Sequence, residues 1–169
     1  YDQILSWAKT YDSSFVQDLE TYKDIIVATL NIERECEKPR KDFAMYSEIE
    51  EALSYMYRFE GESYDWQKIT DKEEIQQILT TYLEKYYHED DDQETWFNQM
   101  KLMCEALGYA ANMKEYKKDP SAFKGNVADV STVIRVALTG RSKTPNLYDI
   151  LQILGKEEMT RRIALIKKQ

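Results

Sequence analysis

Apolar side chains recur every three or four residues along most of the chain, which is the spacing of one face of an α-helix. The first such run extends from Ile4 to Leu30. Asp12, followed by two serines, is placed to end one helix and to cap the next. A helical hairpin or one long helix is therefore expected over residues 4–30.

Helix-start signals mark the next two elements. The segments 47–50 (Ser-Glu-Ile-Glu) and 70–73 (Thr-Asp-Lys-Glu) have the Ser/Thr-x-x-Glu spacing of a capping box. In that device each side chain satisfies a backbone amide that the helix leaves unpaired. The second of these helices carries an apolar stripe to Tyr86, and the acidic run 88–92 after it is expected to be a solvated linker.

In the second half, glycines at 108, 140 and 155 are expected to end helices, because glycine adopts the left-handed backbone of a helix C-terminus without a Cβ clash. The helices that they end are expected to begin near Trp96, at a cap on Asp129 and at Thr144-Pro145, and a final basic helix is expected from about Glu157. No strand-like alternation occurs. We predict an all-α fold of two small helical subdomains, residues 1–90 and 91–169.

The charge is divided unevenly between these halves. The net charge of −8 argues against a nucleic-acid partner, but residues 1–92 carry −13 and residues 93–169 carry +5. A basic second half allows one face to meet a polyanion while the acidic half stays solvated. Ordinary fluctuation in a charged helical protein also explains this asymmetry.

Catalytic and metal-binding residues are scarce. His88 is the sole histidine, the two cysteines Cys36 and Cys104 are isolated, and no glycine-rich phosphate loop occurs. A metal site of His88 with the acids 90–92 would be a poor cage, because consecutive loop residues do not surround an ion. We expect no metal, no cofactor and no catalysis by this chain alone.

Other sequence features bear on where the protein is located and on the role of its aromatic residues. No apolar run is long enough to span a bilayer and no signal peptide is visible, so a soluble, cytoplasmic protein is expected. The 13 tyrosines could form a platform for stacking bases. Most of them lie on the helical stripes, and core packing explains them better.

Two basic segments are not explained by packing. The first is Lys38-Pro39-Arg40-Lys41, whose proline interrupts any regular helix. The second is the loop 140–143, which brings Arg141 and Lys143 next to an expected helix N-terminus at Thr144-Pro145. Free backbone amides and the positive end of the helix dipole favour a phosphate there. An ordinary capped turn is the alternative interpretation.

A series of short stretches then occurs in a specific order. They are residues 31–35 (NIERE), 38–42 (KPRKD), 96–97 (WF), 107–109 (LGY), 124–125 (KG), 135–141 (RVALTGR), 144–147 (TPNL), 154–157 (LGKE) and 161–163 (RRI). Together they resemble the anticodon-binding end of the glutamyl-tRNA synthetases of clostridial and related bacteria. The catalytic signatures of these class I synthetases, of the His-x-Gly-His and Lys-Met-Ser-Lys types, are missing.

The resemblance implies a monomeric, two-part helical region that grips the anticodon loop and stem of tRNA-Glu. ATP and Mg would belong to the absent catalytic domain, which attaches glutamate to the tRNA. A non-catalytic helical module that binds another protein remains the competing hypothesis.

The resemblance also implies roles for single residues. Arg135, Thr144, Pro145 and Leu147 would lie against anticodon bases, with Pro145 and Leu147 supplying apolar surface. Arg40, or else Arg34, would read the third anticodon base. The remaining cations would hold phosphates: Arg141, Lys143, Lys117, Lys118, Lys124, Lys38 and Lys41.

Overall fold

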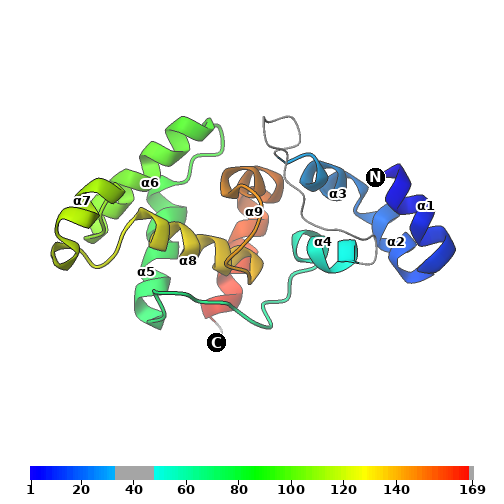
Figure 1. Cartoon of the computed structure of the whole chain (residues 1–169), viewed down its shortest axis with the longest axis horizontal. Coiled ribbons are helices and arrows are strands. Elements are labelled where there is room, and N and C mark those ends of the chain that lie inside the picture. Colours follow the sequence, from blue (N-terminus) through cyan, green and yellow to red (C-terminus); the bar gives the residue numbers. More distant parts are fainter. Residues whose placement is uncertain (33–47, 168–169) are drawn as a thin grey trace.

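The computed structural model describes residues 1–32 and 48–167, and helices dominate this part of the chain (Figure 1). They are α1 (Asp2–Tyr11), α2 (Ser13–Thr21), α3 (Lys23–Leu30), α4 (Ile49–Tyr57), α5 (Lys72–Thr81), the π-helical turn η2 (Tyr82–Tyr86), α6 (Gln93–Leu107), α7 (Met113–Lys118), the 3-10 turn η3 (Pro120–Ala122), α8 (Val127–Thr139) and α9 (Leu147–Lys167). The strand-like pairing recorded among these residues is one isolated bridge between Ala110 and Asn126. The all-α prediction is confirmed.

Helices α1 to α4 form a first group around a small hydrophobic cluster. Asp12 ends α1 and caps α2 as expected, its carboxylate accepting a hydrogen bond from the Phe15 amide at 3.2 Å. The chain breaks again at Tyr22, so the expected hairpin or single long helix is wrong. Ser47, the expected cap of α4, lies outside the described residues. The buried members of the cluster are Ile4, Ala8, Phe15, Leu19, Ile26, Ile49 and Leu53.

Helices α5 to α9 form a second group around a larger cluster, which extends from Ile69 to Ile166. Its centre joins elements on both sides of residue 90, as in the buried hydrogen bond of 3.1 Å that the Trp96 indole donates to the Tyr82 hydroxyl. The boundary expected between residues 90 and 91 thus falls inside one hydrophobic cluster, and the division into two domains stays a prediction.

Two helix caps lie at different residues from those expected. Asp71 rather than Thr70 caps α5, and its carboxylate accepts from the Glu74 amide at 3.0 Å. Asn126 rather than Asp129 caps α8, and these two residues exchange hydrogen bonds of 3.1 Å in a capping box. In α5 the cap thus lies one residue later than predicted, and in α8 it lies three residues earlier; in both cases the observed cap is a strong capping residue.

The three predicted glycine stops are confirmed. Gly108 and Gly140 end α6 and α8 in left-handed conformations with φ of 90° and 74°. Gly155, with φ of 75°, breaks α9 into segments 147–154 and 156–167 that point in different directions (Figure 1).

The first and second groups meet at α9, which lies between them in Figure 1. Arg162 is 1% exposed, and its guanidinium donates to the backbone oxygens of Tyr55 (2.7 Å), Met56 (3.0 Å) and Leu138 (2.8 Å). These carbonyls belong to the last turns of α4 and α8, which have no intrahelical donors of their own. One buried side chain therefore holds the ends of two helices, one from each group.

Two neighbours complete this junction. Glu158 accepts from the Arg162 Nε at 2.9 Å and from Arg161, whose Nη2 also donates to the Phe59 carbonyl at 2.9 Å. Hydrogen bonds from Arg161 and Arg162 hold the pKa of Glu158 below its ordinary value, whereas burial lowers the pKa of Arg162. The burial of this guanidinium is compensated by the four oxygens that accept its hydrogen bonds and by the face of the Phe59 ring, 4.8 Å away.

Candidate nucleic-acid interface

The loop 140–146 connects α8 to α9 and is fixed by the segment that links the two groups. The Asp65 amide donates to the Gly140 carbonyl at 3.1 Å, and the Ser142 hydroxyl donates to the Asp65 carboxylate at 2.5 Å. A Cβ at position 140 would lie 2.8 Å from the Ser63 carbonyl oxygen. Glycine is needed at 140 both for its positive φ and for this close approach.

Arg135 contacts the far end of the same loop. Its Nη1 donates to the Thr144 hydroxyl at 2.5 Å, to the Thr144 carbonyl at 3.1 Å and to the Pro145 carbonyl at 2.9 Å. Arg135 itself is half-buried. The predicted base-reading arginine and the predicted Thr-Pro turn are thus brought together, and the arginine holds the turn.

The turn differs from the expected one. Asn146, not Thr144-Pro145, opens α9, and its side chain accepts from the Asp149 amide at 3.2 Å. Because the helix begins later, Leu147 points into the larger core cluster and is 4% exposed. Pro145 is buried as well. The expectation that Pro145 and Leu147 offer exposed apolar surface is wrong for this conformation.

The two cations of the loop differ in their contacts. Lys143 is exposed. Arg141 points toward α4, where its Nη2 donates to the Glu51 carbonyl at 2.7 Å and its guanidinium lies 4.9 Å from the centre of the Tyr55 ring. Lys143 remains available for a phosphate, whereas Arg141 would have to leave α4 to bind one.

The other predicted phosphate-binding residues lie elsewhere. Lys117 and Lys118, in the last turn of α7, and Lys124, before α8, are all exposed. Helix α7 is at one end of the molecule, away from the α8–α9 connection (Figure 1). Arg34, Lys38, Arg40 and Lys41 lie outside the described residues. The structure therefore does not gather all the predicted cations into one patch.

A cleft of about 500 Å³ adds a cation that the sequence analysis missed. Its walls come from the end of α4, the segment 58–63 and the end of α8, and Arg58 and Arg141 line it together with Glu60 and Glu62. The exposed Arg58 follows the last residue of α4 and pairs at 2.5 Å with the buried carboxylate of Asp18. Its place just after an apolar stripe, where a cation suits the helix dipole, is the signal that could have found it.

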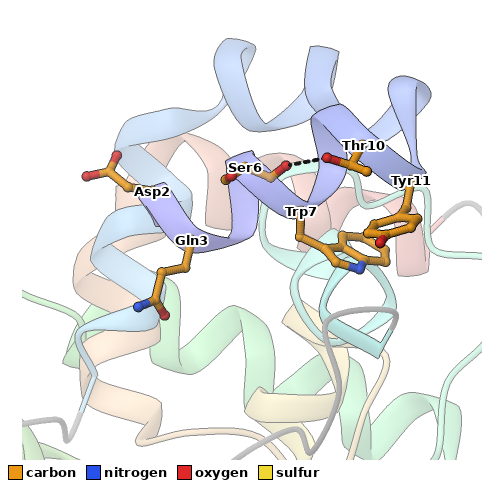
Figure 2. Close-up of a pocket in the computed structure, with 6 residues that line it drawn as sticks. All are labelled: Asp2, Gln3, Ser6, Trp7, Thr10 and Tyr11. Carbon is orange, nitrogen blue, oxygen red and sulfur yellow. Dashed lines mark hydrogen bonds between the residues drawn. The ribbon is translucent and has the colours of Figure 1, made fainter.

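A second hollow lies on α1, and Figure 2 shows its lining. The rings of Trp7 and Tyr11 lie 5.9 Å apart on one side of the helix, and Tyr11 is 74% exposed. Asp2 is the charged residue of this lining. With a carboxylate and no cation in it, the hollow is unsuited to a phosphate backbone.

The acidic run 88–92 has more contacts than a solvated linker. Asp92 caps α6 by accepting from the Thr95 amide at 2.8 Å, and the Tyr148 hydroxyl donates to the Asp91 carbonyl at 2.7 Å. His88 is exposed, and no cluster suited to a metal ion occurs among residues 1–32 and 48–167. Cys104 is a buried member of the larger core cluster, and this burial raises the pKa of its thiol to about 12.

In the described part of the chain, no helix combines the length and apolarity needed to cross a bilayer. No solved structure matches the chain.

The chain is similar in sequence to glutamate–tRNA ligases from several bacteria. The chain is 43% identical over 164 residues to the glutamate–tRNA ligase of Acetivibrio thermocellus, 41% identical over 169 residues to that of Clostridium perfringens strain 13, and 30% identical over 169 residues to that of Sorangium cellulosum. These alignments cover 96–97% of this chain but 29–31% of each relative. The chain thus spans about 30% of the length of the curated relatives that it matches.

The family comparison covers almost all of the helices described above. The model of the anticodon binding domain matches residues 14–166, from the start of α2 to the last turn of α9. The loop 140–146, the Arg135 contacts and the Arg162 junction all fall inside that range. By this match the chain belongs to the family of anticodon-binding domains.

Proposed function

We propose that this chain is the tRNA-binding part of a glutamate–tRNA ligase and that it holds the anticodon loop and stem of tRNA-Glu. The observation that carries the proposal is the identity of 41–43% to clostridial-type glutamate–tRNA ligases over 96% of the chain. The parent enzyme would attach glutamate to its tRNA with ATP. That chemistry, with its Mg, would lie in the portion of the relatives that this chain does not match, so the chain itself needs no cofactor.

The α8–α9 loop supports an RNA-binding role. It is held from both sides, by Asp65 and by Arg135, and it presents the exposed Lys143 beside the N-terminus of α9. Unpaired anticodon bases are recognised by partners held in fixed positions, while lysines on phosphates set the register. A monomer in the cytoplasm is part of the same proposal.

The test is a binding titration of the 169-residue chain with tRNA-Glu, with tRNA-Glu carrying a changed anticodon, and with an unrelated tRNA. Cognate tRNA should bind most tightly, and affinity should fall steeply as salt rises. Equal affinity for all three RNAs would contradict anticodon recognition.

Lys143→Ala sharpens that test, because a phosphate contact carries no base identity. The variant should weaken the binding of all three RNAs nearly alike. It should also reduce the slope of log affinity against log salt concentration by about one unit. Lys9→Ala is the matched control, since Lys9 is an exposed lysine on α1, outside the matched range. A slope that falls equally in both variants would mean that Lys143 is not a phosphate contact.

Catalysis gives an independent check. The chain has no glycine-rich phosphate loop, so it should neither form glutamyl-adenylate nor exchange pyrophosphate with ATP. Measurable exchange by the pure chain would overturn its assignment as the RNA-binding part alone.

A helical protein-interaction module is the second candidate, and one observation favours it. The large apolar side chains of Phe97, Leu102 and Met113 on α6 and α7 are 39–52% exposed. If no tRNA binds, these side chains are where a contact with a protein partner should be sought, beginning with Leu102, the most exposed of the three, whose replacement Leu102→Asp should abolish that contact.

A further inference from the structure

We infer that Arg135 is a positioning residue: with Thr139 it forms a template on α8 that sets the conformation of the loop 140–146 before any RNA arrives. Its influence on the anticodon, which rests on the proposed function, would then pass through the Thr144-Pro145 turn rather than through a direct contact of the guanidinium with a base.

The Arg135 Nη1 holds the turn at the far end of the loop through several hydrogen bonds. This one nitrogen lies 2.5–3.1 Å from three oxygens of Thr144 and Pro145, two of them backbone carbonyls. The Thr144 hydroxyl in turn donates to the Pro145 carbonyl at 2.9 Å. Proline has no amide hydrogen, so the turn lacks one of the backbone donors that would otherwise fix it. A charged side-chain donor with three acceptors replaces that missing constraint.

Thr139 anchors the other end of the loop. It is 3% exposed, its hydroxyl donates to the Arg135 carbonyl at 2.7 Å, and it accepts from the Arg141 amide at 3.1 Å. Residues four apart lie on one face of a helix, so Arg135 and Thr139 present their groups side by side. The two ends of the loop are therefore fixed on a single face of the last turns of α8.

This arrangement has a consequence for recognition. An arginine that reads a base must bring its donors to the base edge. The Nη1 of Arg135 instead points to the turn, where it bonds directly to the buried Thr144 hydroxyl and to the Pro145 carbonyl, which are also bonded to each other. The loop's shape is set inside the protein, and this shape decides which backbone groups face outward.

Hydrogen exchange of the free protein tests the positioning role without RNA. Arg135→Ala and Thr144→Val should each speed exchange of the amides in residues 141–149 by about tenfold, because each removes part of the same hydrogen-bonded unit. Lys143→Ala is the control and should leave these rates unchanged. Unchanged exchange in Arg135→Ala would overturn the proposal, and Thr144→Val gives the same test if Arg135→Ala does not fold.

Binding to tRNA-Glu and to its anticodon-changed form tests the route to the RNA. If Arg135 acts through the turn, Thr144→Val should reduce the ratio of the two affinities as Arg135→Ala does, and the double variant should lose no more than Arg135→Ala alone. Additive losses would mean that the two residues act separately and would overturn the proposal. If the unaltered chain binds both RNAs equally, the proposed function fails, while the exchange rates still decide whether Arg135 holds the loop.

Discussion

The two groups of helices are held together in different ways. The group α5–α9 has a hydrophobic cluster that runs through its helices from Ile69 to Ile166, whereas the cluster of α1–α4 is much smaller. The smaller group meets the larger one through a short apolar contact, Tyr55 and Met56 against Ile150, and through arginines that bind its backbone oxygens. The comparison indicates that the first group depends on the second for its stability.

The largest effect is expected from removing the buried guanidinium at the junction. Arg162→Met keeps much of the side-chain volume but leaves three buried carbonyls of α4 and α8 without a donor. The free energy of unfolding should fall by about 3–5 kcal/mol. Urea denaturation measures this loss, and hydrogen exchange should show that α4 loses more protection than α6.

Arg161→Met is the matched control. Arg161 is 45% exposed and gives one hydrogen bond to the segment that follows α4, through the Phe59 carbonyl. Its loss should cost only about 1 kcal/mol. Equal costs for the two variants would show that the junction does not depend on the buried arginine.

A smaller loss of stability is expected at Gly140, where the segment that links the two groups of helices passes the loop 140–146. Gly140→Ala adds a strained left-handed backbone and brings a Cβ to 2.8 Å from the Ser63 carbonyl. Together these should cost on the order of 3 kcal/mol. Gly108→Ala is the control, because it has a similar φ but its nearest neighbour is a flexible lysine side chain at 3.5 Å. Thermal or urea unfolding of both variants should place Gly140→Ala below Gly108→Ala, and the reverse order would contradict the close approach.

The smallest effect concerns pH. The pKa of Glu158 is lowered chiefly by its hydrogen bond from Arg161. The folded chain therefore favours the ionised form of this carboxylate more than the unfolded chain does. The stabilisation from this carboxylate is full above its ordinary pKa and is lost as pH falls through its lowered value in the folded state. Glu158→Gln should flatten the fall of unfolding free energy as the pH drops below the ordinary glutamate pKa of about 4.5. Parallel pH profiles for variant and unaltered chain would show that Glu158 is not coupled to folding.

Local sequence signals predicted the helices well. Asp12 as a cap and the glycines 108, 140 and 155 as stops were all confirmed, because each acts through the backbone of its own neighbourhood. The caps on Asp71 and Asn126 were misplaced by a few residues, since several capping residues stand close together there. The second break at Tyr22 carries no proline, glycine or strong cap, so the pattern of apolar residues could not reveal it.

The candidate site was harder to predict, because its geometry depends on contacts between distant segments. The sequence drew attention to Arg135, Thr144 and Lys143, but nothing in it shows that the first two bond to each other or that Arg141 reaches Glu51. Arg162 looked like one more cation of a basic helix, and its burial follows only from where α4 and α8 end. Base contact by Arg34 or Arg40, outside the described residues, stays a prediction.

The Arg162 junction also constrains the order in which this chain can assemble. Its bonds to Tyr55 and Met56 join residues 106–107 positions apart, and that of Arg161 to Phe59 joins residues 102 apart. Contacts so distant in sequence form late and slow the search for the native state. During synthesis at about 5–20 residues per second, the ends of α4 must wait several seconds for their arginines to be made. Until then the first group is held only by its own small core, and the apolar face that it turns toward Ile150 stays uncovered.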